Sequence, residues 1–239
     1  MIAFLTSSPF REDADRPMFS NRNGFVDRIA EALPKEPSCL FVCSDPKAHD
    51  FTCRIGVDVF MAFAHAGIHF SSYHVLDGQN AHLAAQLVQA ADLVVLAGGH
   101  VPTQNAFFRS IGLRGLLLAH PCVVMGISAG SMNCADEAYL QPEEEGESAA
   151  SFVRFAPGLG LSQVQILPHY QKVKDYLLDG KRLFEDITYA DSMGHTFYAL
   201  PDFSYVVDDG KRAVLYGEGY RLRNGILEWI SKENEAFLL

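Results

Sequence analysis

The amino-acid sequence predicts an α/β fold, in which a mostly parallel sheet is flanked by helices and antiparallel hairpins lie near the C-terminus. Short apolar runs alternate with longer helix-like segments through the first two-thirds of the chain. Two of these runs, residues 93–97 and 122–126, carry no charged or polar side chain, which is typical of strands buried on both faces. The last third changes to shorter runs separated by Asp-Gly and Asn-Gly pairs, which favour hairpin turns.

The predicted strands are apolar or β-branched runs bounded by turn residues. In chain order they cover residues 2–6, 39–43, 68–75, 93–97 and 122–126. The predicted helices between them carry apolar residues at spacings of three and four. They cover residues 23–33, 52–65, 80–90 and 103–118. This alternation predicts parallel strands connected by helices.

The chain is less regular after the last of these strands. Residues 141–148 are acidic and predict a solvated loop, and residues 164–167 predict a strand that leads into Pro168-His169. Four short runs then follow, at residues 204–208, 213–216, 220–222 and 226–230. We expect them to add antiparallel strands to one edge of the sheet, within a single α/β domain that spans residues 1–239.

Composition excludes several classes of function. The 239 residues are 49% apolar, which suffices for a buried core, and their formal net charge of -10 argues against binding a nucleic-acid backbone. No apolar stretch approaches the roughly 20 residues that cross a bilayer, and no basic region precedes the N-terminal apolar run. The five cysteines are an odd number and favour neither a disulfide framework nor a zinc site. We therefore expect a soluble, cytoplasmic protein without a nucleic-acid, membrane or metal partner.

The most informative motif is a Gly-x-Ser-x-Gly sequence that follows the apolar run at residues 122–126. It places Ser128 between Gly126 and Gly130, and this is the sequence form of a nucleophile elbow. A serine used as a nucleophile must be held on a tight turn, near a base and near N–H groups that can receive negative charge. The glycines allow a strand to turn sharply into a helix at that serine. The alternative is a strand-to-helix turn without chemistry.

A second glycine pair, Gly98 and Gly99, follows the predicted strand at residues 93–97 and precedes His100. In open parallel sheets, binding sites form beyond the carboxyl ends of the strands, so this turn and the elbow are expected to lie near one another. We interpret the N–H of Gly99 as one half of an oxyanion hole and the N–H of Ala129 as the other. An ordinary strand-to-helix turn is the alternative for the glycine pair.

Nine histidines compete for the role of general base. We favour His169, because Pro168 holds the preceding chain extended and the imidazole follows a predicted strand on the same side as the elbow. His100 and His195 remain alternatives. Five others fall in helices, strands or a loop and are better explained as surface or core residues: His65, His69, His74, His82 and His120.

These motifs resemble the peptidase E and cyanophycinase family of serine peptidases, whose fold is similar to that of class I glutamine amidotransferases. The resemblance covers most of the chain and rests on motifs in the family's order: Thr6-Ser7-Ser8, Ala97-Gly98-Gly99, the elbow, Leu167-Pro168-His169-Tyr170 and Ala199-Leu200-Pro201-Asp202. It implies that Ser128 is the nucleophile, His169 the general base and Asp202 the acid that orients it. The order Ser, His, acid along the chain also differs from that of α/β-hydrolase esterases.

The sequence departs from the family at three places. Peptidase E commonly continues its glycine turn as Gly-Gly-Asn-Thr, whereas His100-Val101-Pro102 precedes Thr103 here. The family's acid is often Glu, which is one methylene longer than Asp202. Ser131 stands where Ala is usual.

Family members favour peptides that begin with aspartate, which implies a cation in the pocket. Gly98, His100 and Arg182 are therefore the expected substrate-binding residues. Arg182 belongs to a group of cations after His169, and a solvated helix face is the alternative explanation of that group, which also includes Lys172, Lys174 and Lys181.

The resulting hypothesis is a serine exopeptidase acting through an acyl-enzyme, without metal or cofactor, and preferring dipeptides with N-terminal aspartate. Two alternatives stay open: a hydrolase of another amide or an ester with the same triad, and a non-catalytic binding protein on this scaffold. The expected partner is a small peptide substrate, and a homodimer is left open.

Overall fold

An eight-stranded sheet forms the centre of the protein in a computed structural model that describes residues 1–239. Its strand order is β16-β13-β12-β1-β5-β4-β2-β3. Five neighbouring strands are parallel: β1 (Ile2–Thr6), β5 (Val123–Ile127), β4 (Leu93–Leu96), β2 (Ser38–Val42) and β3 (Ser72–Leu76). Their carboxyl ends therefore point to the same edge of the sheet, as predicted.

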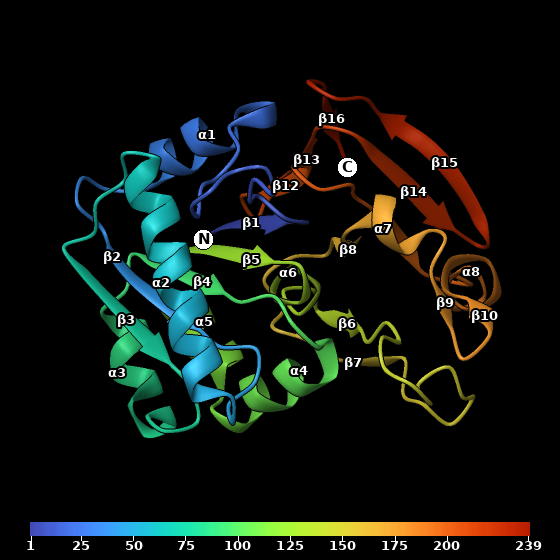
Figure 1. Ribbon diagram of the computed structural model, residues 1–239, viewed down its shortest axis with the longest axis horizontal. Coiled ribbons are helices and arrows are strands. Elements are labelled where there is room, and N and C mark those ends of the chain that lie inside the picture. Colours follow the sequence, from blue (N-terminus) through green and yellow to red (C-terminus); the bar gives the residue numbers. More distant parts are fainter.

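Helices cover both faces of this sheet (Figure 1). One face packs against α1 (Phe25–Ala32) and α2 (His49–His65) through a cluster of 17 buried apolar residues. The other face packs, through a cluster of 35 buried apolar residues, against α3 (Ala84–Gln89), α4 (Val101–Ser110) and α5 (Leu113–Ala119). Along β5, Val124 belongs to the larger cluster and Met125 to the smaller. The central strands are apolar throughout because both of their faces are buried.

One predicted helix is in fact two. The apolar spacing over residues 103–118 predicted a continuous helix, but the chain breaks between α4 and α5 at Gly112. Gly112 has φ +64°, a left-handed conformation that a side chain would disfavour. The interruption lets α5 pack against the sheet at its own angle, which helical spacing alone does not reveal.

The C-terminal strands divide between two sheets. The antiparallel strands β12 (Tyr205–Asp208), β13 (Ala213–Tyr216) and β16 (Ala236–Leu238) extend the central sheet beyond β1, as expected for hairpins at the edge. The next hairpin, β14 (Gly219–Arg223) and β15 (Ile226–Ser231), does not join that edge.

That hairpin belongs instead to a second, four-stranded sheet of order β15-β14-β11-β8. Its other members are β8 (Gln165–Leu167) and β11 (Thr196–Ala199), which are parallel to one another. The expectation that all four C-terminal runs extend one edge was wrong for these two, because β11, which we did not predict, offers β14 an antiparallel partner.

Short elements connect the two sheets. The strands are β6 (Glu137–Tyr139), β7 (Phe155–Pro157), β9 (Leu177–Leu178) and β10 (Lys181–Arg182), and the helices are α6 (Ala129–Met132), α7 (Tyr170–Val173) and α8 (Tyr189–Asp191). Two 3-10 turns, Arg22–Gly24 and Ala81–Leu83, and a π-helical segment, Leu183–Thr188, complete the fold. No helix is long and apolar enough to cross a bilayer.

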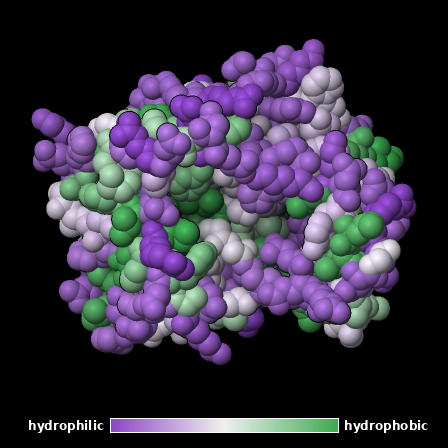
Figure 2. All heavy atoms as spheres, in the orientation of Figure 1, coloured by the Kyte–Doolittle hydropathy of each residue, from purple (hydrophilic) through white to green (hydrophobic).

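The surface of the molecule is mostly hydrophilic on the side drawn in Figure 2. Hydrophobic side chains gather over the helices on the left and over the β9–α8 region on the right (Figure 2). The predicted acidic loop at residues 141–148 is exposed over its middle, but Gln141 and Ser148 at its ends are buried. The loop is thus anchored at both ends.

Candidate active site

Ser128 lies at the apex of a sharp turn between β5 and α6. Its backbone has φ 52° and ψ -113°, a strained conformation for a residue with a side chain. A Cβ at Gly126 would lie 2.5 Å from the backbone N of Ser131, and one at Gly130 would lie 2.3 Å from the backbone O of Leu96. Both glycines are therefore required by close packing of backbone on backbone, which is the physical basis of the elbow.

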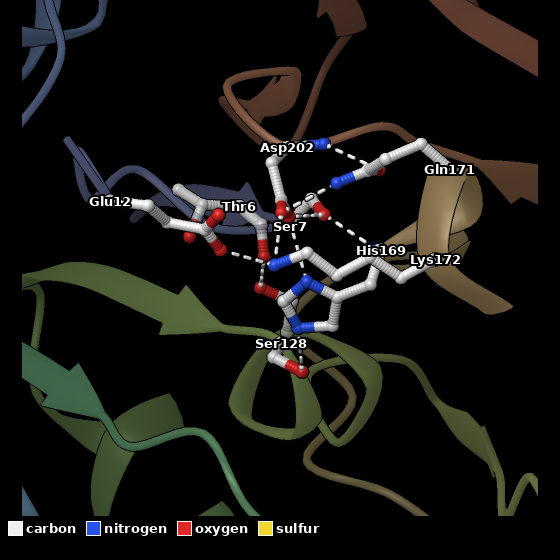
Figure 3. Close-up of polar contacts among 9 residues, drawn as sticks. Thr6, Ser7, Glu12, Ser128, His169, Gln171, Lys172 and Asp202 are labelled. Carbon is white, nitrogen blue, oxygen red and sulfur yellow. Dashed lines mark hydrogen bonds and ion pairs between the residues drawn. The ribbon is translucent and has the colours of Figure 1, made fainter.

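His169 and Asp202 are brought together by the parallel pair in the second sheet. Leu167 at the end of β8 is opposite Ala199 at the end of β11, so the segments that follow both strands emerge side by side. His169 adopts the left-handed conformation, with φ 56°, immediately before α7. Its backbone N–H points to β1, and its ring points to Ser128 (Figure 3).

The three predicted triad residues form one continuous array of hydrogen bonds (Figure 3). His169 Nε2 lies 2.9 Å from Ser128 Oγ, and His169 Nδ1 lies 2.7 Å from Asp202 Oδ1. The carboxylate accepts from Nδ1–H, so Nε2 is left free to accept the hydroxyl proton of the serine. Asp202 reaches the histidine although it is shorter than the glutamate common in the family. The serine is half-buried and the Asp202 side chain is only 8% exposed.

The Asp202 carboxylate is held from several sides. Besides His169, it accepts hydrogen bonds from Ser7 Oγ at 3.0 Å and from Gln171 Nε2 at 2.6 Å, and Lys172 Nζ lies 3.0 Å from Oδ2. Burial alone would raise the pKa of Asp202, but the hydrogen bonds and charges of these partners outweigh it and hold that pKa well below its usual range. The acid is thus ionised and fixed in orientation.

Ser7, at the end of β1, is a component of the site to which we assigned no role from the sequence. Its hydroxyl accepts the backbone N–H of His169 at 2.7 Å and donates to Asp202, so it joins both residues to the central sheet. The backbone N–H of Ser128 donates to the carbonyls of Thr6 and Ser7. The motif Thr6-Ser7-Ser8 was the only signal in the sequence, and nothing in it indicated a contact with residues more than a hundred positions away.

The glycine turn after β4 lies beside Ser128. A Cβ on Gly98 would be 3.4 Å from the Cβ of Ser128, so the glycine turn after β4 packs directly against the serine. The N–H groups of Gly98 and Gly99 donate no hydrogen bond within the protein. Ala129 occupies the first position of α6, where a helical N–H has no partner inside the helix. Each of these donors is available to a ligand.

His100 connects the glycine turn to the acidic loop. Its Nδ1 lies 2.8 Å from Thr103 Oγ1 and its Nε2 lies 3.0 Å from Glu147 Oε1. Donor atoms of His100, Glu144 and Glu147 lie within 4.8 Å of one another, a spacing that could hold a metal ion. However, Glu147 Oε2 also accepts the backbone N–H groups of residues 143 and 144. These hydrogen bonds account for the cluster without an ion.

Glu143, in the same loop, has a raised pKa. Protein atoms crowd around its carboxyl although the residue is open to solvent, and this burial raises the pKa of Glu143 to about 7. The charges of His100 and His169 act in the opposite direction. The backbone N–H of Glu143 donates to Glu147, whose carboxylate contacts His100. We did not single out Glu143 from the sequence, because a run of acidic residues is typical of a solvated loop.

The remaining predicted residues are engaged elsewhere. Arg182 is exposed and binds Asp186 through Nη2 and Nε, and no hydrogen bond or ion pair connects it to the array. The alternative base His195 stacks on Phe155 and lies 3.6 Å from Glu137, and it makes no contact with Ser128. Among the cations that follow His169, Lys172 is the one that contacts the array.

A serine on a strand-to-helix turn, a histidine and a carboxylate in line, and free N–H groups beside the serine are typical of hydrolases with a serine nucleophile. The model of peptidase family S51 matches residues 15–215. The chain therefore belongs to peptidase family S51 and is a serine peptidase.

Two solved structures share the fold. A peptidase from an acI-B1 Actinobacterium has a TM-score of 0.65 and 16% sequence identity, with 100% of this chain and 96% of the other covered. A putative peptidase E from Listeria monocytogenes EGD-e has a TM-score of 0.59 and 17% identity, with 96% and 98% covered. No curated protein matches the sequence.

Proposed function

We propose that the protein hydrolyses short peptides from their N-terminus, with Ser128 as nucleophile, His169 as general base and Asp202 as the residue that orients the imidazole. The observation that carries the proposal is the unbroken sequence of contacts, 2.9 Å and 2.7 Å long, from Ser128 Oγ through the imidazole to Asp202 Oδ1. In this mechanism His169 Nε2 takes the hydroxyl proton as Oγ attacks the peptide carbonyl. The imidazolium then protonates the leaving amine, and water hydrolyses the acyl-enzyme.

We assign stabilisation of the oxyanion in the tetrahedral intermediate to the N–H groups of Gly99 and Ala129. Ala129 follows the serine in the chain, and Gly99 belongs to the glycine turn that packs on the serine through Gly98. Neither glycine N–H of this turn is used by the protein itself. Losing one such donor typically lowers turnover about a hundredfold to a thousandfold.

We assign binding of the substrate's free N-terminal amino group to Glu143. Glu143 belongs to the loop that Glu147 joins to His100, next to the glycine turn. A carboxyl there is suited to bind an ammonium group, and its pKa of about 7 means that it gains its charge near neutral pH. An N-acetylated peptide lacks the ammonium group, so it should be a poor substrate.

The preference for N-terminal aspartate, which the family resemblance implies, requires a cation for the substrate side chain. We assign this role to Lys172 ahead of Arg182. Both cations are ion-paired, Lys172 with Glu12 and Asp202 and Arg182 with Asp186, but only Lys172 contacts the array. Loss of the preference in Arg182→Met but not in Lys172→Met would reverse that assignment.

Two measurements test the proposal. A fluorophosphonate probe should label Ser128 in the wild type, and the label should be absent in Ser128→Ala and strongly reduced in His169→Ala. Aspartyl dipeptides, neutral dipeptides, N-acetylated dipeptides and simple esters should then be compared as substrates, with Ser128→Ala as the blank. Equal labelling of the His169→Ala variant would refute the triad. Equal hydrolysis of acetylated or of neutral peptides would refute the exopeptidase or the aspartate assignment, respectively.

A further inference from the structure

A second nucleophile, histidine and carboxylate stand in line at another point of the fold. Cys53 Sγ lies 3.7 Å from His49 Nε2, and His49 Nδ1 lies 2.5 Å from Asp77 Oδ2. The imidazole is oriented as in the Ser128 array, where Nδ1 faces the carboxylate and Nε2 faces the hydroxyl. This group lies at the carboxyl end of β3, which is three strands from β5 in the sheet and therefore roughly 14 Å from Ser128.

Local structure explains why these side chains meet. His49 and Cys53 are four residues apart in the first turns of α2, so they lie on the same face of the helix. Asp77 follows β3 and is only 2% exposed. Its Oδ1 accepts the N–H of Gln79, and its own N–H donates to Asn80 Oδ1. The carboxylate is thus held rigidly, while the histidine and cysteine reach the surface.

The geometry favours proton transfer over metal binding. Cys53 and Asp77 lie at opposite nitrogens of one imidazole, so the three groups cannot converge on a single ion. With Nδ1–H donated to the carboxylate, Nε2 is the free acceptor that faces the thiol.

The other four cysteines differ from Cys53 in burial. Cys39, Cys43, Cys122 and Cys134 are buried, and burial raises the pKa of each thiol above its usual value. Cys53 is the partly exposed cysteine, and it is the one that a histidine contacts. Among the five thiols it is therefore the one that combines access with a base.

We propose that Cys53 is a reactive thiol and the site at which small disulfides form a covalent adduct with this protein. His49 Nε2 accepts the thiol proton as Sγ attacks one sulfur of the disulfide R–S–S–R. The bond between Sγ and that sulfur forms while the S–S bond of the reagent breaks. The departing sulfur takes the electron pair of that bond and then the proton from the imidazolium, so Cys53 is oxidised and one equivalent of R–SH is released.

The test uses the native protein and dithiodipyridine, a neutral disulfide whose released thione is coloured. The expected result is one fast thiol per chain at neutral pH, located at Cys53 by peptide mass mapping, with the four buried thiols reacting only on unfolding. Cys53→Ser should lose the fast phase. His49→Gln should slow it by roughly a hundredfold or more, as loss of a general base does. Ser128→Ala should react as the wild type.

The pH profile separates the base from a merely structural role of His49. The wild-type rate should fall less steeply below neutral pH than that of His49→Gln, whose unassisted thiol loses about tenfold in rate for each pH unit. Circular dichroism of Cys53→Ser and His49→Gln establishes that both proteins are folded. A fast thiol that maps elsewhere, or a folded His49→Gln that reacts at the wild-type rate over the whole pH range, would overturn the proposal.

Discussion

Replacing Ser7 by alanine tests whether the end of β1 positions the catalytic array. The change removes the hydroxyl that joins the backbone N–H of His169, at 2.7 Å, to Asp202 Oδ1, at 3.0 Å. Asp202 keeps His169, Gln171 and Lys172, so it stays ionised at neutral pH, but both members of the pair lose their tie to the central sheet.

The expected magnitude follows from the kind of bond that is lost. A hydrogen bond to a charged group contributes about 1.5–3 kcal/mol. If this free energy serves to position the imidazole and the carboxylate, its loss lowers the rate roughly tenfold to a hundredfold. The buried His169 N–H is left without an acceptor, so the free energy of unfolding should also fall, by about 1–3 kcal/mol.

The assay is the second-order rate of fluorophosphonate labelling at Ser128, which reports on the nucleophile without a choice of substrate. Urea unfolding measures the stability of the same samples. Ser8→Ala is the matched control, because the Ser8 side chain makes no hydrogen bond in the structure and only its carbonyl is used, by Phe203. Peptide kinetics should show the loss in kcat with little change in KM. A Ser7→Ala protein that is folded and labelled at the wild-type rate would refute the positioning role.

Three further predictions follow from the same contacts. Gly130→Ala should unfold at least about 1–3 kcal/mol more easily, because its Cβ would lie 2.3 Å from the Leu96 carbonyl. Gly115→Ala, in an open helical position, should be neutral or up to about 1 kcal/mol more stable in chemical denaturation, and equal behaviour of the two would contradict the elbow packing. The pKa of Glu143 is raised to about 7, so between its ordinary value of 4.5 and 7 the folded state binds a proton that the unfolded state has lost. Stability should therefore decline as pH rises between these values, and it should decline less in Glu143→Gln. Binding of peptides with a free amino group should improve over the same rise only in the wild type. The lowered pKa of Asp202 contributes stability that is present above 3.8 and is lost as pH falls through its folded-state value, so thermal unfolding of Asp202→Asn should approach the wild type only in strong acid.

The sequence by itself determined the central parallel strands and the turn that carries Ser128. Parallel strands buried on both faces must be apolar throughout, and a serine on a strand-to-helix turn needs glycines where backbones touch, so both features leave a local signature. The parallel strands, the position of Ser128 and its two glycines could therefore be predicted. The residues alone favoured His169 among the histidines, and the resemblance strengthened that choice. Asp202 could be named only through the resemblance, because a proline-aspartate pair is also an ordinary turn sequence.

Tertiary structure decided what surrounds that serine. The register of β8 against β11 sets His169 beside Asp202, and the end of β1 supplies Ser7 to both. These contacts depend on pairings between distant strands, and no period or composition of a single segment encodes them. The same reason explains why β14 and β15 left the predicted edge for a second sheet. It also explains why His49 meets Cys53 on its own helix but a carboxylate, Asp77, that follows a distant strand.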